Sequence, residues 1–238
     1  MKYSLYLLLL CPLLFACQNG EQAESGNDHP SSEQPAAHSH DHHGDANNHM
    51  NQRPFEDLVE GFESPQRAEW QKPDSVIALL GDLEGKTVVD IGSGSGYFSF
   101  RLAEAGAHVI SADVDERFLE HIEERKEKEG MTDAQIETRH VPYDSPKLEE
   151  GEVDLAFMVD VYHHIKQRPD YFAKVKKGLK PGGRLVVVDF IKEEIPVGPP
   201  VEMKLEPEQV LEELKKAGFT EFEVNEKLLP YQYIVTAR

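Results

Sequence analysis

Cysteine is almost absent from this chain of 238 residues. The two cysteines that it has, Cys11 and Cys17, both lie close to the N-terminus. The rest of the chain therefore has no disulfide, no cysteine pair to bind a metal and no cysteine nucleophile. Cysteine usage also gives no information about the redox compartment of the folded part.

Basic residues are also scarce. Lys and Arg number 25 against 44 Asp and Glu, so the formal net charge is −19. A charge of this sign opposes binding to the phosphate backbone of a nucleic acid, and the sequence has no basic stripe. The largest run of charges, from Asp115 to Glu129, mixes both signs and is typical of a solvated helix face. We expect no nucleic-acid partner.

Long apolar runs are lacking as well. The stretch Leu5–Leu14 is interrupted by Pro12 and is too short to span a bilayer. It follows Lys2, so residues 1–17 are interpreted as a signal segment outside the fold. The sequence Leu14-Phe15-Ala16-Cys17 resembles the processing box of bacterial lipoproteins, which implies a lipid anchor on Cys17 and a place on the membrane of the cell envelope, facing the periplasm. Ordinary signal cleavage and an uncleaved anchor are the alternatives.

Residues 18–52 show no apolar periodicity and cannot bury a core. We predict a disordered linker that holds the following domain, residues 53–238, away from the membrane. Six of the 11 histidines lie in it: His29, His38, His40, His42, His43 and His49. Histidine clusters can bind Zn, Cu or Ni, but a fixed site needs ordered ligands. A spacer without a metal site is the favoured interpretation.

From Arg53 onward, apolar segments alternate with helical patterns. Strands are predicted at 87–91, 108–112, 136–141, 153–159 and 184–188, and helices at 55–62, 74–80, 97–105, 115–129, 169–179 and 207–217. Asp74 or Ser75 is the expected cap of the second helix, and the fourth helix is expected to begin after Asp115 and end at Gly130. Pro65 and Pro73 punctuate the segment between the first two helices. Apolar strands separated by helices indicate a parallel sheet covered on both faces. Two further strands, 221–224 and 231–236, have no helix between them and must form an antiparallel hairpin. The prediction is an α/β fold with a seven-stranded, mostly parallel sheet.

A glycine-rich turn follows the first strand: Asp90-Ile91-Gly92-Ser93-Gly94-Ser95-Gly96. The order strand, turn and helix is typical of a nucleotide-type site at the carboxyl end of a parallel strand. The dinucleotide fingerprint requires a glycine where this chain has Tyr97, and the phosphate loop requires a lysine that is lacking here. Neither of those two sites is therefore predicted.

The pattern Asp-x-Gly-x-Gly-x-Gly resembles the first motif of class I methyltransferases that depend on S-adenosyl-L-methionine (SAM). The segment Met158–Ile165, with its two histidines, and the turn Leu179–Leu185 resemble other motifs of the small-molecule members. The terminal hairpin resembles that of their Rossmann-like sheet. The resemblance implies SAM as the cofactor. The residues it places in contact with SAM are Asp90, Gly92, Gly94, Gly96, Asp113, Val114, His140 and Asp160.

Each contact has a chemical reason. Asp113 ends the second strand, and a carboxylate there can accept hydrogen bonds from both ribose hydroxyls. The N-terminus of the helix after the glycines would receive the carboxylate of SAM, and Asp90 would lie near its ammonium group. The third strand lacks the acid that usually meets the adenine, so His140 or backbone groups would take its place.

Methyl transfer needs a general base only if the nucleophile arrives protonated. The candidates are Asp160, His163 and His164, and histidine titrates in the suitable range. Adjacent histidines diverge on a helix, which disfavours a metal site between them. Asp189, Phe190 and the loop 195–200 are expected to border the acceptor. Trp70 either closes over the ligands or packs as a surface anchor.

These patterns together predict a tethered SAM-dependent methyltransferase acting on a small molecule. One alternative is a non-catalytic envelope protein that binds a ligand or metal on the same fold. Another is a nucleotide-dependent oxidoreductase, which Tyr97 disfavours. The sequence identifies neither the methyl acceptor nor the oligomeric state.

Overall fold

The computed structural model describes residues 47, 50 and 52–238. The predicted signal segment with Cys17, and the six histidines of the predicted linker, lie outside the described residues. Within the part that is described, no helix is both long enough and apolar enough to cross a bilayer.

The centre of the domain is a sheet of seven strands in the order β3-β2-β1-β4-β5-β7-β6. The strands are β1 (Thr87–Ile91), β2 (His108–Asp113), β3 (Ile136–His140), β4 (Val153–Val159), β5 (Leu179–Phe190), β6 (Phe222–Asn225) and β7 (Gln232–Ala237). The first five pair in parallel, and β7 runs antiparallel to both β5 and β6. The predicted α/β architecture and terminal hairpin are confirmed.

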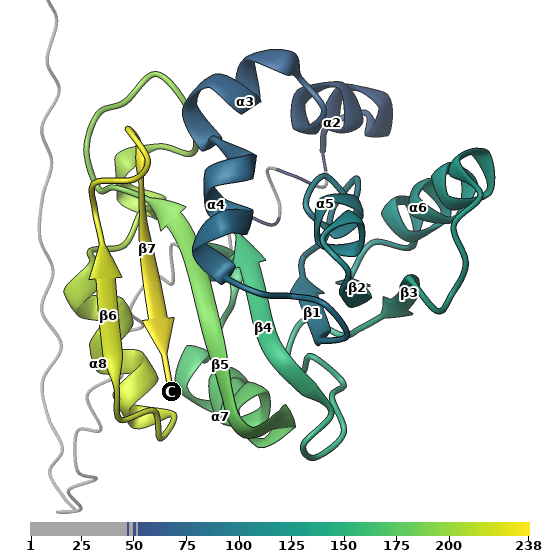
Figure 1. Ribbon diagram of the computed structural model, residues 1–238. Helices are drawn as coiled ribbons and strands as arrows, with labels where there is room; N and C mark the ends of the chain where they lie inside the picture. Colours follow the sequence, from purple (N-terminus) through teal and green to yellow (C-terminus); the bar gives the residue numbers. More distant parts are fainter. Residues whose placement is uncertain (1–46, 48–49, 51) are drawn as a thin grey trace, which may run out of the picture. The chain divides into compact units, whose positions relative to one another are not determined.

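Strand order reverses at β1, which pairs with β2 on one side and β4 on the other. The connections out of β1 and β4 therefore diverge and leave room beyond their carboxyl ends, where open α/β sheets bind ligands. Figure 1 shows two short helices, α2 (Phe55–Phe62) and α3 (Pro65–Gln71), beyond the arrowheads of β4 and β5.

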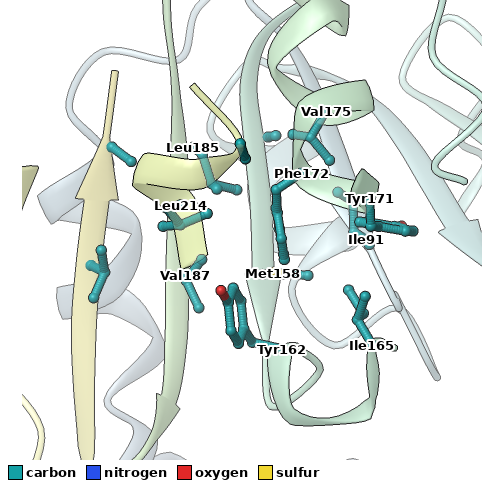
Figure 2. Close-up of a cluster of buried hydrophobic side chains, with 14 of the residues drawn as sticks. Ile91, Met158, Tyr162, Ile165, Tyr171, Phe172, Val175, Leu185, Val187 and Leu214 are labelled. Carbon is teal, nitrogen blue, oxygen red and sulfur yellow. The ribbon is translucent and has the colours of Figure 1, made fainter. Parts of the chain in front are cut away.

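Both faces of the sheet are buried, and side chains alternate between them along each strand. On one face, Met158 and Val187 pack with side chains of α7 (Arg168–Gly178) and α8 (Pro207–Lys216); Figure 2 shows this cluster. On the other face, Phe157 and Val186 pack with α4 (Pro73–Leu80), α5 (Ser99–Glu104) and α6 (Glu116–Glu129). The central strands are therefore apolar at successive positions of the sequence.

The N-termini of two helices differ from the prediction. Pro65 and Pro73 are the first residues of α3 and α4, because the missing N–H of proline would have no helical partner at that position. The N-cap of α4 is Lys72, in the left-handed region at φ 44°, and neither Asp74 nor Ser75 caps it. By contrast, Asp115 caps α6 through the N–H of Arg117, as its position before the charged run suggests.

Candidate cofactor and acceptor site

A cavity of about 470 Å³ lies at the carboxyl ends of β1, β2, β4 and β5. This volume lies in the range of small-molecule sites. The cavity is lined by the glycine turn and by most residues predicted from the sequence: Asp90, Gly92, Gly94, Asp113, Val114, Asp160, His163 and His164. The space beside the turn is open, so a ligand can reach the end of the sheet.

The glycine turn requires residues without a side chain. Gly92 has φ 71°, and a Cβ on it would lie 2.5 Å from Val161. Gly96 has φ 81°, and a Cβ there would press on Ile122 and Phe100 at 3.0 Å. Any other residue would strain the backbone and displace buried side chains. Gly96 does not itself line the cavity; it shapes the turn from behind.

Asp113 faces this turn. Its Oδ2 accepts the N–H of Gly94 at 2.8 Å, and its Oδ1 accepts the N–H of Asp115 at 3.0 Å. Burial raises the pKa of Asp113, although these backbone N–H groups oppose the rise. Each carboxylate oxygen can accept a further hydrogen bond. Asp113 therefore both fixes the turn and offers acceptors to the cavity, as a ribose contact requires.

Asp90 lies at the base of the turn and is buried. Its Oδ2 accepts the hydroxyl of Ser99 at 2.7 Å, and burial raises its pKa to about 6. At neutral pH it is a carboxylate within the cavity wall, where a ligand cation stabilises it. This suits the predicted position of the ammonium group of SAM.

Two buried hydroxyls beside the turn support a polar ligand there. Ser93 and Tyr97 line the cavity, and neither of their buried hydroxyls has a hydrogen-bond partner in the described part of the chain. Buried polar groups of folded proteins are nearly always hydrogen-bonded. The turn therefore fits a cofactor rich in polar groups, such as SAM.

His140 is not brought to the cavity. Its ring is half exposed, with Nε2 3.2 Å from the carbonyl oxygen of Val114 and Nδ1 3.1 Å from Glu116. The cavity wall near Val114 is formed by Phe118 and Tyr143 instead. Phe118 was visible in the sequence only as an apolar position of a charged helix, and Tyr143 had no signal.

The N-terminal helices cover the glycine turn. Phe62 lies over Gly94, where a Cβ would meet its ring at 3.2 Å, and it stacks on Phe118 at 5.6 Å. Glu63, just after α2, accepts the hydroxyl of Ser95 at 2.6 Å. Residues Asn47 and Met50 line the cavity too, although they precede the predicted domain boundary at residue 53. The cavity is thus enclosed from the N-terminal side.

His163 is held rigidly at the end of β4. The preceding Tyr162 is buried and stacks on Phe172 at 4.7 Å, which fixes the short 3₁₀ turn η1 (Tyr162–His164). Nδ1 of His163 lies 2.9 and 3.1 Å from the two oxygens of Asp189, and both side chains are buried. Burial lowers the pKa of His163, but the carboxylate of Asp189 more than offsets this, so the net pKa is raised.

Asp189 accepts three groups: Nδ1 of His163, the backbone N–H of His163 at 3.2 Å and that of Phe190 at 2.8 Å. The bond at Nδ1 places the proton on that nitrogen and leaves Nε2 with the lone pair. Nε2 makes no hydrogen bond to a described residue, and His163 lines the cavity. The arrangement provides a proton acceptor in the cavity.

The other two candidate bases are less suited. Burial, and then the neighbouring His163, lower the pKa of His164 to about 3, and its Nδ1 lies 3.0 Å from Oδ1 of Asn47. Burial raises the pKa of Asp160 to about 6, but its carboxylate is occupied: it accepts hydrogen bonds from Gln71, at 3.3 Å, and from Gln232. Asp160 therefore joins α3 to the end of the sheet. Among the described residues, no group of three or more His, Cys, Asp or Glu could hold a metal ion.

Aromatic and proline side chains form the remaining wall. Trp70 of α3 lies 5.9 Å from the ring of Phe190, measured between ring centroids. A Cβ on Gly198 would lie 2.7 Å from Phe190, so the loop 195–200 passes directly over that ring. Pro199, Pro200 and Met203 line the same end of the cavity. Trp70 is thus a residue of the cavity, and Asp189 supports the wall from behind His163.

A sheet of this order, with a glycine turn after β1 and an acid at the end of β2, defines the class I SAM-dependent methyltransferase fold. Residues 89–187 match the family described as "Methyltransferase domain". A SAM-dependent methyltransferase from Aquifex aeolicus has a similar structure, with a TM-score of 0.71 and 26% identity; the match covers 78% of this chain and 98% of that one. The chain thus carries a SAM-dependent methyltransferase domain, and SAM is the cofactor of this class.

Two kinds of curated relative are similar in sequence. A tRNA U34 carboxymethyltransferase from Klebsiella pneumoniae is 32% identical over 129 residues, which cover 53% of this chain and 37% of the relative. A ubiquinone biosynthesis O-methyltransferase from Roseobacter denitrificans is 31% identical over 110 residues, covering 46% of this chain and 43% of the relative. The chain spans about two fifths of the length of these relatives.

Proposed function

We propose that this protein transfers a methyl group from SAM to a small molecule, with His163 as the general base. The observation that carries the proposal is the His163–Asp189 pair, which faces the same cavity as the glycine turn and Asp113. A base and a cofactor turn in one cavity are what methyl transfer to a protonated nucleophile needs.

SAM supplies the methyl group as an electrophilic carbon on its sulfonium sulfur. In the chain, the glycine turn, Asp90, Asp113 and Val114 would hold the cofactor. Nε2 of His163 accepts the proton of the acceptor, and Asp189 keeps the proton on Nδ1 and stabilises the resulting imidazolium. Asp160 and His164 shape the cavity around the base.

The walls around His163 favour a small aromatic acceptor with an ionisable hydroxyl. Trp70 and Phe190 offer ring faces, and the prolines and Met203 are apolar. The ubiquinone biosynthesis O-methyltransferase among the relatives agrees with a hydroxyl acceptor. The tRNA U34 carboxymethyltransferase suggests a nucleic-acid substrate, which the net charge of −19 disfavours here.

Calorimetric titration of the purified chain with SAM and with NAD tests the cofactor. We expect binding of SAM and none of NAD; binding of NAD alone would favour the oxidoreductase alternative. Transfer of a labelled methyl group to catechol, as a model acceptor, tests the activity. Binding of SAM without transfer to catechol or to any member of a panel of phenols would favour a non-catalytic ligand-binding protein.

We also propose that Cys17 carries a lipid and that the polar segment after it, up to residue 46, tethers the domain to the bacterial envelope, facing the periplasm. The support is the sequence at residues 14–17 and the polar composition of the linker. Cys17→Ala should move the protein from the membrane fraction to the soluble fraction and abolish labelling by a fatty acid. A membrane-bound, unlabelled Cys17→Ala protein would point to an uncleaved anchor instead.

A further inference from the structure

The cavity has many carboxylates and few cations. Its described lining includes four acids, Asp90, Asp113, Asp115 and Asp160, and two arginines, Arg53 and Arg67. The amino-acid end of SAM carries a carboxylate as well as an ammonium group. An anion entering a wall of carboxylates needs a compensating cation. The question is which group of the chain supplies it.

The helix after the glycine turn does not supply it. We expected that helix to begin at Tyr97, but α5 begins at Ser99 and has only six residues. The side chain of Ser99 is already bonded to Asp90. A helix this short has a weak dipole, and its first turn faces a carboxylate. We therefore look for another group of the chain to meet the carboxylate of SAM in place of the helix N-terminus.

Arg67 is the better placed of the two arginines. Arg53 is exposed and its Nη2 lies 3.4 Å from the carbonyl oxygen of Asp57. The Arg67 side chain is only 13% exposed, and its guanidinium lies 4.3 Å from the centroid of the Tyr97 ring. Arg67 comes from α3, so the cation approaches the glycine turn from the covering helices.

The donors of Arg67 are partly used. Nε donates to Oε1 of Gln71, and Nη1 donates to the carbonyl oxygen of Phe62 at 3.0 Å. Nη2 lies 3.8 Å from Asp160, which is too far for a hydrogen bond. Burial lowers the pKa of Arg67, but a guanidinium remains charged in proteins. Nη2 can therefore donate to a ligand.

Tyr97 provides the second, independent observation. Its side chain is 5% exposed and lines the cavity, and its hydroxyl has no hydrogen-bond partner in the described chain. The guanidinium of Arg67 lies over the face of the Tyr97 ring, so the phenol O–H and the free guanidinium N–H come from adjacent side chains. Both groups can donate to the oxygens of a carboxylate.

We propose that Arg67 and Tyr97 form the subsite for the carboxylate of the cofactor, an inference that rests on SAM being the cofactor. Arg67 lies outside the matched segment 89–187, so part of the cofactor site comes from the N-terminal helices. The same residue is linked through Gln71 to Asp160 and Gln232. Binding of the carboxylate therefore holds α3 against the end of the sheet.

The test compares two ligands, SAM and decarboxylated SAM, which lacks only the carboxylate. Calorimetry should show that the full chain binds SAM about 10- to 100-fold more tightly, as expected for charge-assisted hydrogen bonds. Arg67→Met should remove this preference, and Tyr97→Phe should reduce it in part. The ratio of the two affinities is the readout, because a merely loosened α3 weakens both ligands equally.

Arg101→Met is the matched control. Arg101 also contacts the Tyr97 ring, at 3.9 Å, but does not line the cavity. It should keep the full preference for SAM. The subsite is wrong if Arg67→Met keeps that preference, or if the unmodified chain binds both ligands equally. Failure of the unmodified chain to bind either ligand would instead remove the proposed function, and the subsite with it.

Discussion

The two ends of the cavity hold a ligand by different means. At the cofactor end, the turn Asp90–Phe98 forms much of the wall, and Asp113 at the end of β2 accepts the N–H of Gly94. At the acceptor end, the wall consists of side chains from distant segments. Trp70, His163 and Phe190 come from α3, η1 and β5.

This difference indicates which residues of the cavity can be substituted and which cannot. A substitution in the glycine turn strains the backbone and displaces neighbouring side chains, because a Cβ on Gly92 would lie 2.5 Å from Val161. Exchange of Trp70 or Phe190 for another apolar residue changes the shape of the acceptor end and leaves the turn intact. The fold can thus keep one cofactor and accept different substrates, because the glycine turn takes no part in the acceptor wall. Helix α3 contributes to both ends, through Arg67 and Trp70.

The largest effect is expected at the base. His163→Asn should lower methyl transfer to catechol about 10²- to 10⁴-fold, the usual contribution of general-base catalysis. The amide nitrogen of asparagine takes the position of Nδ1 and can keep the bond to Asp189, whereas Nε2 is removed. The affinity for SAM should be unchanged, which calorimetry can check.

His164→Asn is the control for this variant. His164 is neutral near pH 7 because its pKa is about 3, and its Nδ1 bond to Asn47 can likewise be kept. The rate of methyl transfer by His164→Asn should stay within about threefold of that of the unmodified chain. This loss is much smaller than the loss expected when a general base is removed. Equal losses in the two variants would mean that the rings only pack against each other, at 4.3 Å, and that neither is the base.

The next largest effect is expected at Asp113, in the cofactor end of the cavity. Asp113→Ala should weaken SAM binding about 100-fold, because two charge-assisted hydrogen bonds to the ribose are lost. Asp113→Asn keeps the size of the side chain and should lose less. An unchanged affinity in Asp113→Ala would remove the ribose assignment, and a circular dichroism spectrum would show whether the fold persists.

The sequence predicted the elements that have a local cause. The strands followed from apolar runs, the turn from glycine spacing, and the Asp115 cap and Gly130 stop from the ends of a charged helix. The acceptor end has no such local cause: the pairing of Asp189 with His163 joins residues 26 positions apart. Both were singled out, but only the structure shows that they touch.

Two errors have physical reasons. His140 or backbone groups were expected at the adenine because β3 offers no acid, but the ring of His140 turns toward Glu116 and the carbonyl oxygen of Val114. Pro65 and Pro73 were expected only to punctuate the segment between two helices, so α3 was missed and with it Arg67. A proline at the first position of a helix is sterically favoured, and the sequence alone does not separate the two cases here.

The third effect concerns pH. Because the pKa of Asp90 is about 6, its carboxylate is protonated below that pH and no longer attracts the ammonium group of SAM. The affinity for SAM should therefore be constant above pH 7 and fall to about one tenth by pH 5, the change that linkage gives for one group. Calorimetry from pH 5 to pH 8 checks this. Asp90→Asn should bind more weakly at pH 7 and show a flatter profile.

The smallest effect lies at the far wall of the acceptor end. Trp70→Ala should raise the KM for catechol about 3- to 10-fold, the value of one aromatic contact, and leave the affinity for SAM unchanged. Trp70→Phe keeps a ring beside Phe190 and should lose less. Trp70 is also the only tryptophan of the chain, so catechol should quench its fluorescence. If Trp70→Ala weakened SAM as much as catechol, Trp70 would act by holding α3, which also carries Arg67, and not by contacting the acceptor.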